Sequence, residues 1–171
     1  MDLLLSISFA SFSSVWYWIL TGLAWSLTCH RTLGVPYDAL VSAHQKGGQV
    51  AADAEEMALI YVRRVVPLFR STGPYILAVA SFGLAVVATF GFVYRYELAL
   101  AAFALLFPLS IVNTMGILLA FRIERDGLTG EALRKALTRR RFWNQVIGLV
   151  SIFVASILTV FALSRNVVLF Y

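Results

Sequence analysis

The sequence predicts an all-α polytopic membrane protein with four transmembrane helices and a cytoplasmic amphipathic helical connection. Sixty per cent of the 171 residues are hydrophobic and 13% are charged, whereas soluble domains carry roughly 25% charged residues. The mean hydropathy is +0.82. Four stretches lack Asp, Glu, Lys and Arg, and each exceeds the roughly 20 apolar residues that cross a bilayer: residues 3–29, 71–94, 98–121 and 142–164. This composition excludes a soluble enzyme, a nucleic-acid-binding domain and a secreted disulfide-rich protein.

Helix-ending residues set the limits of the predicted spans. These spans cover residues 15–33, 74–95, 98–122 and 142–164, within a single domain of residues 1–171. Gly34 and Pro36 follow the first span in the order typical of a helix end. The turn between the second and third spans is so short that these helices are expected to be antiparallel neighbours. A helix that begins at Glu131 continues into the fourth span. Residues 3–12 and 167–171 are predicted to form apolar segments at the outer face of the membrane.

Residues 36–70 are predicted to form a cytoplasmic amphipathic arm. Residues 36–46 indicate one short helix, which ends at Gly47 and Gly48. Beyond this break, apolar residues recur at spacings of three and four, which indicates a second helix. This helix either lies flat on the inner leaflet or runs into the second span, where Pro67 and Pro74 would kink it.

The distribution of positive charge predicts the orientation of the chain. All but two of the 14 Lys and Arg residues lie in residues 30–70 and 122–141. Lys and Arg near the ends of spans remain on the cytoplasmic side. Both basic connections are therefore predicted to be cytoplasmic, and both termini periplasmic.

The sequence offers little that points to catalysis. Cys29 is the single cysteine, so no disulfide can form within the chain. No nucleophile–base pattern, P-loop or dinucleotide fingerprint is present, and no residues have the spacing of a metal site. We expect no enzymatic activity, no cofactor and no ionised group among the packed apolar helices. No nucleic-acid partner is expected, and no small-molecule substrate is identified.

Two polar residues lie near the middle of the third predicted span. Asn113 and Thr114 interrupt an otherwise apolar stretch, and the amide of Asn113 is expected to find a partner on a neighbouring helix. That partner is either inside the bundle, on another subunit, or a substrate.

Charged residues beside the spans suggest two contact surfaces. Arg139, Arg140 and Arg141 lie next to the fourth span, where basic clusters attract anionic lipid headgroups; alternatively, they only determine topology. A docking face for a partner is predicted on the cytoplasmic arm, formed by Asp53, Glu56, Arg63 and Arg64.

Several strings resemble a small alphaproteobacterial inner-membrane family that carries the label "component of SufBCD complex". They are residues 12–18 (FSSVWYW), 33–38 (LGVPYD), 91–94 (GFVY) and 145–153 (QVIGLVSIF). The resemblance spans nearly the whole chain. It implies a multi-pass protein of the bacterial inner membrane and an accessory link to iron–sulphur assembly, in which a chain with one cysteine would tether such machinery.

Two functions remain open at this point. The first is a non-catalytic accessory, assembly or scaffold subunit of a larger inner-membrane complex, for instance an energy-transducing one, whose partners are membrane lipids and other membrane-protein subunits. The second is a small membrane subunit of a secondary transporter. A transporter predicts a polar cavity near Asn113, whereas an accessory subunit predicts a dry bundle and an outward partner surface.

Overall fold

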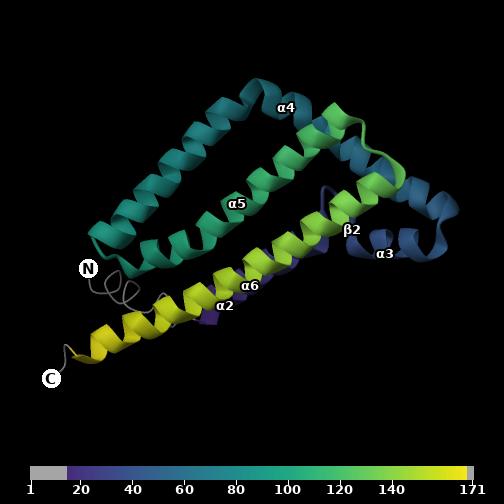
Figure 1. Cartoon of the computed structure of the whole chain (residues 1–171). Coiled ribbons are helices and arrows are strands. Elements are labelled where there is room, and N and C mark those ends of the chain that lie inside the picture. Colours follow the sequence, from purple (N-terminus) through teal and green to yellow (C-terminus); the bar gives the residue numbers. More distant parts are fainter. Residues whose placement is uncertain (1–14, 169–171) are drawn as a thin grey trace. The chain divides into compact units, whose positions relative to one another are not determined.

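The computed structural model describes residues 15–168, which form helices joined by short turns (Figure 1). In chain order the elements are α2 (Val15–His30), β1 (Arg31–Thr32), β2 (Val35–Pro36), α3 (Tyr37–Lys46), α4 (Gly48–Ala88), the π-helix η1 (Thr89–Val93), α5 (Glu97–Asp126) and α6 (Gly130–Val168). The predicted apolar segment at residues 3–12 lies outside the described residues, as do residues 169–171 of the second such segment.

Three helical segments are long and apolar enough to cross a membrane: Gly48–Val93, Glu97–Asp126 and Gly130–Val160. Glu97–Asp126 contains the whole of its predicted span, residues 98–122, and the other two segments contain all but the last residues of the second and fourth predicted spans. α2 has 16 residues, fewer than the roughly 20 that cross the hydrocarbon core. The all-α class is therefore confirmed, while a fourth span stays a prediction.

A tight hairpin ends α2 earlier than the apolar pattern predicts. β1 and β2 pair antiparallel, and the two residues between them, Leu33 and Gly34, have positive φ angles of 50° and 77°. Two consecutive positive φ angles are what a type I′ turn requires. A Cβ at Gly34 would also lie 3.1 Å from the Tyr61 ring. The helix therefore stops at His30, and the predicted end at Leu33 falls in the turn.

α4 joins the predicted arm to the second predicted span. Gly47 and Gly48, with φ angles of 59° and 54°, separate it from α3, as the sequence predicts. α4 then continues to Ala88 through Pro67 and Pro74. Of the two arrangements left open for the second arm helix, the structure shows the one that runs into the span. The predicted boundary between residues 70 and 74 is absent.

The chain packs into two compact units. We call residues 15–25, 78–110 and 147–168 the span unit, and residues 26–77 and 111–146 the arm unit. Buried apolar side chains from the hairpin, α3, α4, α5 and α6 form the core of the arm unit: Leu33, Val35, Ala43, Ala54, Ala58, Val62, Val66, Ala120, Ile123, Leu133 and Leu137. The polar connections are thus folded around their own hydrophobic core.

In the span unit, helices approach closely at glycines. A Cβ at Gly91 would lie 3.0 Å from backbone atoms of Leu100 on α5, so η1 and the first turns of α5 touch through their backbones. On α6, a Cβ at Gly148 would lie 2.8 Å from the ring of Trp25. Further along, Ser151 donates a hydrogen bond to the carbonyl oxygen of Ala104 at 3.4 Å. Small residues therefore let α2, α5 and α6 pack tightly within this unit.

Candidate functional site: the outer face of the arm helix

Residues 48–70 of α4, which we call the arm helix, have a buried side and an exposed charged side. Ala54, Ala58, Val62 and Val66, each four residues from the next, lie in the core of the arm unit. The opposite side exposes a set of residues that we call the outer face: Asp53, Glu56, Met57, Ile60, Arg63 and Arg64. Because an α-helix has 3.6 residues per turn, these positions share one side. The structure therefore brings the four predicted docking residues together on one exposed surface.

Two polar contacts anchor the arm helix to the rest of the arm unit. The carboxylate of Glu55 accepts a hydrogen bond from the backbone N–H of Gly130 at 2.9 Å, and Arg70 forms an ion pair with Glu124 at 2.7 Å. The two anchors are roughly 22 Å apart along α4 at 1.5 Å per residue, but their partners flank the short turn between α5 and α6. The arm helix therefore crosses the ends of α5 and α6 (Figure 1).

Glu55 caps the first turn of α6, which gives a testable effect on stability. A carboxylate at a helix N-terminus satisfies an unpaired N–H and interacts favourably with the helix dipole. We expect Glu55→Ala to lower the free energy of unfolding by about 1 kcal/mol. The matched Glu56→Ala change, on the exposed outer face, should stay within about 0.5 kcal/mol. Thermal denaturation in detergent, followed by tryptophan fluorescence, compares the two variants. Equal shifts in Tm would contradict the capping role.

Arg140 is buried, which the basic cluster in the sequence does not indicate. It is 7% exposed, deeper than any other charged side chain whose burial the structure describes. Its guanidinium donates hydrogen bonds to the side-chain oxygen of Asn144 and to the carbonyl oxygen of Val112 on α5. Asn144, 3% exposed, donates to the carbonyl oxygen of Thr28 at 3.3 Å. Arg140 and Asn144 thus link α6 to both α2 and α5 within the arm unit.

The burial of Arg140 corrects two expectations. Arg140 is not placed to contact lipid headgroups, and an ionised group does lie among packed helices. The two acceptors of its guanidinium, on Asn144 and Val112, are neutral oxygens, and its Nε is buried without a hydrogen-bond partner among the described residues. Gly116 on α5 lies beside the guanidinium: a Cβ there would be 3.5 Å from Nη2, an ordinary van der Waals distance.

The neighbouring arginines lie in different environments. Arg139 is exposed and Arg141 is partly buried. Consecutive residues of a helix point about 100° apart, so the three arginines do not form one surface. Of the three arginines predicted to contact lipid headgroups, Arg139 is the one that is exposed enough to do so.

The two intramembrane polar residues lie on the outside of α5. Asn113 and Thr114 are both exposed. The interior packing role considered for Asn113 is therefore not what the structure shows. Because Asn113 is exposed, its partner could be a neighbouring subunit or a substrate, the two alternatives that remain.

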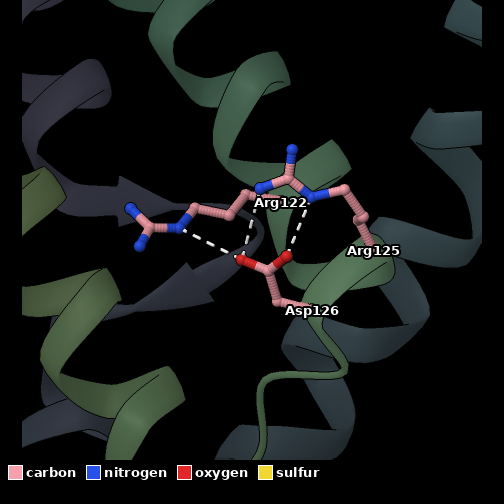
Figure 2. A network of polar contacts seen from close by, with 3 residues as sticks. All are labelled: Arg122, Arg125 and Asp126. Carbon is pink, nitrogen blue, oxygen red and sulfur yellow. Dashed lines mark hydrogen bonds and ion pairs between the residues drawn. The ribbon is translucent and has the colours of Figure 1, made fainter.

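Two arginines form ion pairs with an aspartate at the C-terminal end of α5. Figure 2 shows Arg122 and Arg125 directed at the carboxylate of Asp126. Nε of Arg125 donates to this carboxylate at 2.8 Å and Nε of Arg122 at 3.4 Å. The hydrogen bond from Arg125 is the main cause that holds the pKa of Asp126 below its usual value. An aspartate at a helix C-terminus is disfavoured by the helix dipole, so the two arginines offset that cost and stabilise the turn into α6.

The described residues offer two features: an exposed surface of charged and apolar side chains on α4, the outer face, and a buried arginine on α6, Arg140. Among the side chains that the structure describes, no three His, Cys, Asp or Glu residues gather as metal ligands would. Comparisons with protein-family models, with curated proteins and with solved structures find no match to this chain.

Proposed function

We propose that this chain is a non-catalytic accessory, assembly or scaffold subunit of a larger complex in the bacterial inner membrane. The observation that carries the proposal is the outer face of the arm helix, where four charged and two apolar side chains are exposed together. Such a mixture of exposed apolar and charged groups is typical of protein–protein contacts. The opposite side of the arm helix is packed in the core of the arm unit, so little ordering of the helix would be needed on binding.

The polar groups exposed on α5 also favour a neighbouring subunit. Asn113 lies in a charge-free apolar stretch, where an amide that faces lipid is unfavourable. Hydrogen bonds to an adjacent helix relieve this cost. A transporter subunit predicts a polar cavity at Asn113, whereas the exposure of this residue on the outside of α5 favours the accessory role.

The basic residues support an orientation for the proposed subunit. Most of them lie in the arm unit, on residues 30–70 and 122–141. By the positive-inside tendency, the arm unit is on the cytoplasmic side and both termini are periplasmic. Arg139, exposed beside the fourth predicted span, is then well placed to contact anionic lipid headgroups.

Reversing the positive end of the outer face tests the proposed role. The Arg63→Glu/Arg64→Glu variant should recover much less partner protein when the tagged chain is purified in a mild detergent, because the surface charge no longer matches the partner. Mass spectrometry of the co-purified proteins measures the loss. The Arg63→Lys/Arg64→Lys variant keeps the charge and should retain most of the partner. A variant with reversed charge that recovers the wild-type set of proteins would count against the proposal.

A further inference from the structure

Charge is ordered along the outer face of the arm helix. The acidic residues, Asp53 and Glu56, lie at its N-terminal end, and the basic residues, Arg63 and Arg64, lie at its C-terminal end. The residues between them are apolar and exposed by 46% and 43%, respectively: Met57 and Ile60. The face therefore has an apolar centre between a negative end and a positive end.

A face of this kind is complementary to itself when two copies meet antiparallel. A two-fold axis that passes between Met57 and Ile60 places the acidic end of each face opposite the basic end of the other. Asp53 then lies opposite Arg64 of the second copy, and Glu56 lies on the same side as its Arg63, offset by about 3 Å along the helix. We propose that a second copy of this chain covers the outer face, with the two arm helices paired antiparallel. This rests on the proposed function, which takes the outer face as a docking surface.

The course of the arm helix allows this pairing inside one membrane. Two copies inserted in the same direction are related by a two-fold axis along the membrane normal. Helices parallel to that axis could pair only in the parallel sense, whereas helices that lie across it pair antiparallel. The contacts of Glu55 and Arg70 place the arm helix across the ends of α5 and α6. These two helices are candidate membrane spans, as is the helical segment Gly48–Val93, whose charge-free part begins at residue 71, beyond the arm helix. The antiparallel arrangement is therefore compatible with insertion.

The apolar centre and the charged ends have different roles in the pairing. Burial of Met57 and Ile60 favours association of the two arm helices in any register that brings these apolar side chains together. The charges select among registers, because parallel pairing would bring like charges together. Surface ion pairs add little affinity individually, so their contribution is specificity for the antiparallel register.

A charge-swap experiment tests this register. Two differently tagged copies of the full-length chain are co-expressed, and recovery of the second tag is measured after purification through the first. Arg63→Glu/Arg64→Glu makes the face entirely acidic and Asp53→Arg/Glu56→Arg makes it entirely basic. Each variant should lose self-recovery by about tenfold, since four weak attractions become repulsions.

Mixing the two variants distinguishes pairing between arms from general damage. Co-expression of the acidic and the basic variants puts opposite charges at all four facing positions, so recovery should return to the wild-type level or above it. The variant with all four charges exchanged keeps the net charge and should also recover itself. Failure of both combinations to restore recovery overturns the proposal.

Cross-linking tests the position of the axis without altering charge. In a Cys29→Ser background, Ile60→Cys places a thiol next to the proposed axis, and a short bis-maleimide reagent should convert the chain to a dimer. Gln49→Cys is the matched control on the same helix, about 15 Å from the axis at 1.5 Å per residue, and should remain monomeric. Equal cross-linking at both positions, or none at Ile60→Cys, would rule out the pairing.

The two proposals can fail separately. If the tagged chain recovers another subunit through the outer face but no second copy, the antiparallel pairing is wrong and the accessory role stands. If it recovers a second copy and no other subunit, the pairing stands and the accessory role is wrong.

Discussion

Arg140→Ala is expected to lower the free energy of unfolding by about 3 kcal/mol, the range of large-to-small changes at buried sites. The change removes most of a side chain that is 7% exposed and leaves a cavity between α5 and α6. It also removes the donor to the Asn144 side-chain oxygen, and an unsatisfied buried amide adds a cost of its own. Thermal denaturation in detergent, or the fraction that stays monodisperse after heating, measures the effect.

Two companion variants separate packing from charge at this position. Arg139→Ala changes the adjacent exposed arginine and should alter stability by less than about 0.5 kcal/mol. Arg140→Met keeps much of the volume, so it should be milder than Arg140→Ala by the cost of the cavity. It removes the same donor to Asn144, so part of the loss remains. If Arg139→Ala and Arg140→Ala behave alike, Arg140 acts as an exposed headgroup contact, and its buried structural role is wrong.

Local sequence features predict the helices of this chain well. The charge-free stretches over residues 98–121 and 142–164 lie in long helices, and all but the last residue of the stretch over 71–94 lies in α4 and η1. Length and apolarity, which predict these helices, are properties of each segment alone. The glycine break before α4 is likewise local, since a positive φ favours glycine. The end of α2 was wrong by three residues, because the hairpin at Leu33 and Gly34 depends on pairing and on the Tyr61 ring, which lies far along the chain.

The polar contacts were harder to predict than the helices, because they depend on tertiary structure. The spacing of Asp53, Glu56, Arg63 and Arg64 is sufficient to place them on one helix face, and all four are exposed in the structure. Glu55 was missed because its partner, the N–H of Gly130, is unrelated to it in local sequence.

The burial of Arg140 was also not predicted, although one signal was available. Arg140 is the same residue type as its neighbours Arg139 and Arg141, so the residue type alone does not single it out. Its distinguishing feature is Asn144, four residues later on the same side of the helix, where a side chain can reach back to it. Only the packing of α2 and α5 against α6 decides which of the three arginines is enclosed, so this residue could not be selected from the chain alone.

Gly91→Val is expected to destabilise the span unit by about 1–3 kcal/mol, the usual cost of forcing extra atoms into a packed site. A Cβ at Gly91 would lie 3.0 Å from both Cα and N of Leu100. Backbone atoms cannot rotate away as a side chain can, so η1 and α5 would have to separate. The edge-to-face contact between Phe92 and Phe103, with ring centroids 5.4 Å apart, would be weakened as the two segments move.

Gly83→Val is the matched control, because no heavy atom lies within 4 Å of a Cβ at Gly83. Both glycines lie in the same apolar stretch and gain the same side chain, so helix propensity and hydropathy change in the same direction. The difference in Tm between the two variants in detergent therefore measures the close approach of η1 and α5. If both variants lose stability equally, that approach is not what requires glycine at position 91.

If Gly83→Val alone weakens recovery of co-purified subunits while its Tm is unchanged, the open side of α4 at Gly83 is a second contact surface of the proposed complex, because small residues in spans let a neighbouring helix come close.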